Sequence, residues 1–122
     1  MLQHESRPLV ADNSGAKKVL IIQKLFGNNK NFVRWKNIAI AVVKKSNLLK
    51  KRTFPSSIHR ILLIRTPIFV SRNKLVKIRF DQTAVIIINK KNLPLSTRIK
   101  GPVLHEICVK FPFIGTISEL IL

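Results

Sequence analysis

The stretch 74–89, which reads KLVKIRFDQTAVIIIN, constrains the fold more than any other part of the chain. In its first half, Val76, Ile78 and Phe80 alternate with charged residues, a period of two that is typical of a strand with one buried face. After a short polar interruption, residues 84–88 are continuously apolar and mostly β-branched, which indicates a strand buried on both faces. We therefore predict a hairpin at the centre of a sheet.

Other apolar, β-rich runs precede this hairpin, and turn formers or cations bound each of them. These runs are residues 9–11, 19–26, 38–43 and 58–66. Between the first two, residues 12–15 (DNSG) are four consecutive turn formers, and Gly15 can adopt positive φ. The spacing predicts a small five-stranded β-barrel, mainly β in class, whose closure would remove the exposed edges of an apolar sheet.

The C-terminal part has a different period. Apolar residues fall at helical spacing between Pro102, which suits the first helical position, and Pro112, which would end the helix. They are Val103, Leu104, Ile107, Cys108 and Phe111. Residues 115–122 then predict one more helical turn on the sheet. With 122 residues we expect one domain, with the barrel at about 1–95 and short helices at about 101–122.

The charge balance points to a polyanionic partner. The chain has 23 Lys and Arg against 5 Asp and Glu, a net charge of +18, yet 46% of its residues are hydrophobic, which argues against a disordered basic tail. Self-repulsion of this charge destabilises a compact body, and bound nucleic acid would relieve it. An anionic membrane surface is a weaker alternative. No apolar run approaches the ~20 residues of a spanning helix, and residues 1–8 lack the apolar core of a signal peptide.

Most cations lie just outside an apolar run, so a barrel would present them at its ends and on one exposed face. Mobile cations in such places suit contacts to phosphates. The predicted RNA contacts from these clusters are Lys17, Lys18, Lys30, Arg34, Lys44, Lys45, Lys50, Lys51, Arg52, Arg72, Lys74, Arg79 and Arg98. The same clusters also contain Lys36, Lys77, Lys90, Lys91 and Lys100. Tyrosine is absent and most phenylalanines lie in apolar runs, which favours recognition of phosphate and shape over base stacking.

The sequence contains no recognisable catalytic motif. His4, His59 and His105 share no metal-ligand spacing, the five carboxylates form no pair, and Cys108 is the single cysteine. We predict no catalytic residue, metal, cofactor or small-molecule substrate. We predict that Cys108 lies on the apolar face of its helix and packs in the protein core.

Three blocks of the chain resemble family fourteen of the large-subunit ribosomal proteins, a universal family. The first is residues 11–19 (ADNSGAKKV), the second is 64–66 (IRT) with 78–81 (IRFD) and 84–89, and the third is 97–99 (TRI) with 101–103 (GPV) and Glu106. The blocks keep the family's order and nearly bacterial spacing over essentially the whole chain.

The resemblance implies a five-stranded barrel with a projecting hairpin and small C-terminal helices. It implies a structural protein that binds large-subunit rRNA at the subunit interface, with small-subunit rRNA in a bridge and ribosomal proteins of families nineteen and three as neighbours. The matching blocks add Asn13, Ser14 and Arg65 to the predicted RNA contacts. A ribosome-silencing factor docks on the family's C-terminal region, and the matching positions here are Thr97 and Arg98.

The chain also departs from the family pattern. Residues 32–37 replace a glycine-rich loop, Asn73 and Lys74 stand where Asp-Gly is usual, Arg60 replaces a small residue, and residues 112–113 (PF) replace part of a basic helix. These departures indicate a fast-evolving version, as organelle-encoded members of the family are. Because the first block begins at residue 11, we expect no transit peptide before it. We predict the mitochondrial ribosome, with plastid and bacterial origins as alternatives. The alternative function is a free-standing protein that binds and compacts nucleic acid.

Overall fold

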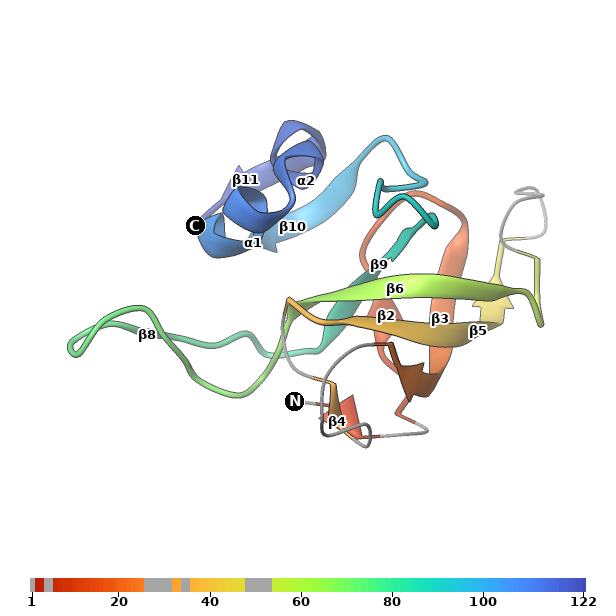
Figure 1. Ribbon diagram of the computed structural model, residues 1–122, viewed down its shortest axis with the longest axis horizontal. Helices are drawn as coiled ribbons and strands as arrows, with labels where there is room; N and C mark the ends of the chain where they lie inside the picture. The colour runs from red at the N-terminus through yellow and green to blue at the C-terminus, as the bar shows by residue number, and fades with distance from the viewer. Residues whose placement is uncertain (1, 4–5, 26–31, 34–35, 48–53) are drawn as a thin grey trace.

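A computed structural model describes residues 2–3, 6–25, 32–33, 36–47 and 54–122 (Figure 1). The strands are β1 (Leu2–Gln3), β2 (Leu9–Val10), β3 (Ala16–Lys24), β4 (Phe32–Val33), β5 (Ile38–Ser46), β6 (Ile58–Arg65), β7 (Val70–Ser71), β8 (Lys77–Ile78), β9 (Ala84–Ile88), β10 (Ile99–Val103) and β11 (Ser118–Ile121). The helices are α1 (His105–Lys110) and α2 (Pro112–Ile117).

Within this part of the chain, five strands close into a barrel in the order β2-β3-β5-β6-β9. Antiparallel pairing joins β2 to β3, β3 to β5, β5 to β6 and β6 to β9, and a parallel pairing of β2 with β9 completes the ring. The predicted five-stranded barrel is confirmed, and each of the four predicted runs before the central stretch contributes a strand to it. Closure pairs both sides of every barrel strand, which protects the apolar sheet from edge association.

Strand β9 lies between two hydrophobic clusters, because alternate side chains of a strand point to opposite faces. Val85 and Ile87 belong to an inner core inside the barrel, where small residues such as Ala39 and Ala41 fit the narrow interior. Ala84 and Ile86 belong to an outer core on the other face. All five residues of β9 are buried, so the predicted burial on both faces is confirmed.

The outer core is covered by the C-terminal segment. Ile107 of α1 and Ile114 of α2 are completely buried against Leu62 and Ile64 of β6 and their neighbours. In Figure 1 the helices and β10 lie together on one side of the barrel. The barrel and the C-terminal segment, which the prediction divided at about residue 95, therefore share the outer core.

Two features of the C-terminal segment differ from the sequence prediction. Pro102 does not begin a helix; it lies in β10 at a register shift and pairs with Leu120 of β11. The chain stays extended to Leu104, the residue before α1. As predicted, the helix before Pro112 ends there, since α1 stops at Lys110. Pro112 then starts α2, because the missing N–H of proline costs nothing in a first helical turn. The predicted helical turn at 115–122 is wrong beyond residue 117, where β11 runs parallel to β10.

The predicted hairpin between 74–81 and 84–89 is also wrong. Strand β8 pairs with β7, not with β9, and the β7–β8 hairpin projects from the barrel at the left of Figure 1. The reason is local: Asn73 Oδ1 accepts hydrogen bonds from the backbone N–H groups of Leu75 (2.9 Å) and Val76 (2.7 Å), which fixes the turn. Val76 is therefore exposed, whereas Ile78 and Phe80 pack against the outer core.

Candidate nucleic-acid interface

The loop 12–15 is fixed by one buried carboxylate. Asp12 is only 7% exposed, and its Oδ1 accepts hydrogen bonds from the backbone N–H and the hydroxyl of Ser14. Its Oδ2 accepts a hydrogen bond from the backbone N–H of Ile87 in β9, at 2.9 Å. Gly15 has the predicted positive φ, 102°. The carboxylate thus joins the loop to the central strand and sets the direction in which residue 13 points.

Asn13 connects this loop to a segment 84 residues away. Its Oδ1 accepts hydrogen bonds from the backbone N–H groups of Thr97 (3.1 Å) and Arg98 (3.2 Å), and its Nδ2 donates to Thr97 Oγ1 at 3.1 Å. Beside these bonds, the backbone N–H of Lys100 donates to the carbonyl of Ala11 at 2.8 Å. The predicted RNA contact at Asn13 and the predicted protein contact at Thr97 and Arg98 therefore form one continuous surface.

Four exposed lysines lie on two paired strands next to this surface. Lys17 and Lys18 are in β3, and Lys44 and Lys45 are in β5. The register pairs Lys18 with Lys45, and the ladder is irregular on both sides of this pair. Like charges on paired positions destabilise a sheet. We call these residues the four-lysine cluster. A groove of about 410 Å³ beside it is lined by Asn13, Gly15, Lys17, Asn47 and Lys100, among others.

Arg65 is held within the protein. Its Nη2 donates to the carbonyl of Lys100 at 2.7 Å, and burial lowers the pKa of its guanidinium. Gly101 allows this close approach, because a Cβ at that position would lie 2.5 Å from Arg65 Nη1. Arg65 Nε is buried without a hydrogen-bond partner among the described residues. Arg65 was a predicted RNA contact. In the structure, at least part of its guanidinium instead holds β6 against β10.

Arg72 is also engaged with the protein. Its Nε and Nη2 donate to the two carboxylate oxygens of Glu106 at 2.6 and 3.1 Å, and Nη2 also donates to the carbonyl of Leu122 at 2.6 Å. The hydrogen bonds and positive charge of Arg72 lower the pKa of Glu106. The hydrogen bond and negative charge of Glu106 in turn raise the pKa of Arg72. This ion pair could not be predicted from the sequence, because its partners are 34 residues apart.

The remaining predicted cations are on the hairpin or outside the described residues. Lys74 is exposed at the tip of the hairpin, and the Arg79 guanidinium lies 5.0 Å from the centroid of the Phe69 ring. The predicted contacts outside the described residues are Lys30, Arg34, Lys50, Lys51 and Arg52.

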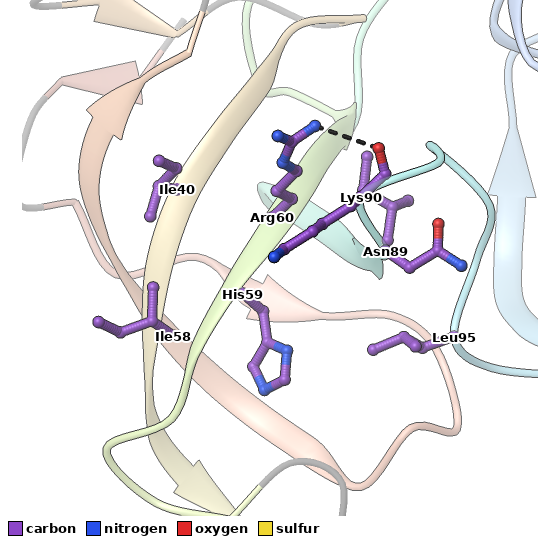
Figure 2. Close-up of a pocket in the computed structure, with 8 residues that line it drawn as sticks. Ile40, Ile58, His59, Arg60, Asn89, Lys90 and Leu95 are labelled. Carbon is purple, nitrogen blue, oxygen red and sulfur yellow. Dashed lines mark hydrogen bonds between the residues drawn. The ribbon is translucent and has the colours of Figure 1, made fainter.

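A second hollow lies beside β6, between β5 and the segment that follows β9 (Figure 2). It has a volume of about 590 Å³ and is lined by Ile40, Ile58, His59, Arg60, Ile88, Asn89, Lys90 and Leu95. Arg60 is not among the predicted RNA contacts. The alternation of side chains along β6 could have indicated it, because Arg60 lies on the face opposite the inner-core residues Ile61 and Leu63.

The described residues contain no group of three or more His, Cys, Asp or Glu side chains that could hold a metal ion. Cys108 is partly buried, and this burial raises the pKa of its thiol. No helix in the described part of the chain has the length and apolar character needed to cross a membrane.

A small closed barrel with strongly basic strand ends is the kind of scaffold that structural proteins of ribonucleoprotein particles use. Comparison with known families makes this specific: the family described as ribosomal protein L14p/L23e matches residues 1–122, and the chain belongs to it.

Membership confirms the family that the three blocks predicted. It makes the chain a structural component of the large ribosomal subunit and not an enzyme, located in a ribosome, with rRNA and other ribosomal proteins implied as partners. It therefore favours the ribosomal interpretation over a free-standing compacting protein.

Proposed function

We propose that the chain binds large-subunit rRNA through the four-lysine cluster and the adjoining surface of Asn13, Thr97 and Arg98. The observation that carries this proposal is the pairing of Lys18 with Lys45. Like charges on paired positions destabilise a strand pair in isolation, but a phosphate near both lysines would be attracted to both. Among the described residues the ion pair that forms is Arg72–Glu106, so the cluster has no carboxylate partner there.

The salt dependence of binding tests this surface. Because each neutralised phosphate contributes roughly 0.7–0.9 to the slope of log affinity against log salt, we expect Lys18→Ala with Lys45→Ala to reduce the slope by about 1.4–1.8. The measurement is filter binding of the full chain to purified large-subunit rRNA over a salt series. The matched control is Lys24→Ala with Lys110→Ala, which removes two lysines, one in β3 and one in α1, that belong to none of the predicted contact clusters. Equal slopes for the two double variants would contradict the proposal.

We further propose that this surface lies at the subunit interface of a mitochondrial ribosome, next to small-subunit rRNA and ribosomal proteins of families nineteen and three. The three sequence blocks and the departures from the family pattern support this placement. Sedimentation of a mitochondrial lysate tests it. The chain should migrate with the large subunit and remain with rRNA fragments after nuclease treatment. Absence of the chain from the mitochondrial large subunit would overturn the mitochondrial assignment, and the same sedimentation of a plastid or bacterial lysate would then test those ribosomes.

The ribosome-silencing factor is a separate proposal for the same surface. Thr97 already contacts Asn13 through its hydroxyl, so the exposed side chain of Arg98 is the better position for a test. Arg98→Ala should weaken retention of the purified factor on the immobilised full chain, whereas Lys91→Ala should not. Equal retention by both variants would remove Arg98 from the docking surface.

A further inference from the structure

The hollow in Figure 2 is formed where the C-terminal segment stops covering the barrel. Along β6, Leu62 and Ile64 are completely buried in the outer core. Ile58, on the same face, is 65% exposed. An aliphatic floor is thus left open at this end of β6.

A cation lies in the middle of this floor. The strand register aligns Ile40 of β5, Arg60 of β6 and Ile88 of β9 in one row across three strands. In Figure 2, Arg60 and Lys90 lie between Ile40 and Ile58 on one side and Leu95 on the other. The row places a guanidinium directly beside the apolar side chains.

The cations of the hollow have donors to spare. Within the described residues, the hydrogen bond of the Arg60 guanidinium is a long one, 3.4 Å from Nη1 to the carbonyl of Lys90. A guanidinium has five N–H donors, and the ammonium of Lys90 adds three more on an exposed residue. None of the residues that line the hollow has a carboxylate side chain. The hollow therefore has an apolar surface next to an unneutralised site for an anion.

We propose that this hollow holds one unstacked nucleotide of rRNA, with its base against Ile40, Ile58 and Leu95 and its phosphate on Arg60 and Lys90. The volume of about 590 Å³ lies within the range of roughly 300–1,000 Å³ that small-molecule sites occupy. A nucleotide joins a flat apolar face to an anion, which matches the arrangement of the lining. An apolar segment of a neighbouring protein would match the floor but would leave both cations without a counter-charge.

This inference rests on the proposed binding of rRNA and adds a site outside the four-lysine cluster. Extruded bases are the part of a folded RNA that proteins reach most readily. Since the floor is aliphatic and offers contact area more than hydrogen bonds, the site should tolerate different bases.

A matched pair of charge substitutions tests the site. Ile58→Asp places a carboxylate in the hollow, and Val109→Asp places one on α1 at a residue of nearly equal exposure, 65% against 67%. Both variants lose the same net charge, so the general electrostatic effect cancels. We expect Ile58→Asp to bind purified large-subunit rRNA about tenfold more weakly than Val109→Asp, as for the loss of one charge-assisted contact. Both residues are exposed, and thermal unfolding checks that both variants fold.

A crosslink identifies the occupant. The full chain carries p-benzoylphenylalanine in place of Ile58, is incorporated into large subunits and is irradiated, and the adduct is digested with nuclease and protease. A nucleotide attached to the peptide supports the proposal. An adduct to a peptide of another ribosomal protein overturns it in favour of a protein occupant, and equal affinities of Ile58→Asp and Val109→Asp overturn it as well. If the salt slope still depends on Lys18 and Lys45, the proposed function stands without this site.

Discussion

At the scale of single residues, Gly101 has a backbone conformation that residues with a side chain rarely adopt. Its φ is +82°, and a Cβ would lie 2.5 Å from Arg65 Nη1. We expect Gly101→Ala to lower the free energy of unfolding by about 1–2 kcal/mol, because the side chain strains the backbone and displaces a guanidinium that donates to Lys100.

Thermal or urea unfolding of the full chain measures this effect, and Gly115→Ala is the control. Gly115 lies inside α2 with φ in the ordinary region, and a Cβ there would meet Cys108 Cβ at 3.4 Å. Alanine favours a helix over glycine by about 1 kcal/mol, so this variant should be as stable as the parent or slightly more stable. Equal losses at both positions would show that volume, not backbone conformation, limits these sites.

At the scale of elements, the pair of Arg72 and Glu106 attaches the hairpin to α1 and should make stability depend on pH. The pKa of Glu106 is lowered in the folded chain, so its contribution is present above the unfolded pKa of about 4.3. It is lost as pH falls through the lower, folded value. We expect Glu106→Gln to melt below the parent at pH 7, and the difference to vanish in acid. Glu119→Gln in β11 is the control, and a difference that persisted in acid would contradict the ion-pair explanation.

The elements also show what the sequence could predict. Strands β2, β3, β5, β6 and β9 follow from local patterns of apolar residues, because burial on a closed sheet requires those patterns. The partner of β8 does not follow, since it depends on the side chain of Asn73 bonding its own turn. Strand β11 was also not predictable, because its conformation depends on pairing with β10, from which α1 and α2 separate it in sequence.

The candidate site was also only partly predictable, because the sequence shows where the cations are but not which of them are paired. The lysines at strand ends are visible in the sequence, because they interrupt apolar runs. Their consequences require register: the pairing of Lys18 with Lys45 and the row of Ile40, Arg60 and Ile88 arise only when strands pair. The contact between Asn13 and Thr97 requires the barrel to close. The sequence therefore identified charges, and the fold determines which of them act together.

At the scale of the whole molecule, a net charge of +18 on a barrel with two hydrophobic cores should make the free chain and its RNA complex respond to salt in opposite directions. In the free chain, salt screens the repulsion among lysines, so the melting temperature should rise as ionic strength increases from about 0.05 M to about 0.5 M. In the complex with large-subunit rRNA, salt weakens binding, and with it the stabilisation that binding gives to the folded state.

Thermal unfolding of the chain alone and with rRNA over the same salt series measures both slopes. Lys18→Ala with Lys45→Ala should flatten both, because the pair contributes repulsion in the free chain and attraction in the complex. A melting temperature of the free chain that did not change with salt would mean that the lysines are too far apart, or too well hydrated, to repel one another. The pairing of Lys18 with Lys45 would then no longer favour a bound phosphate.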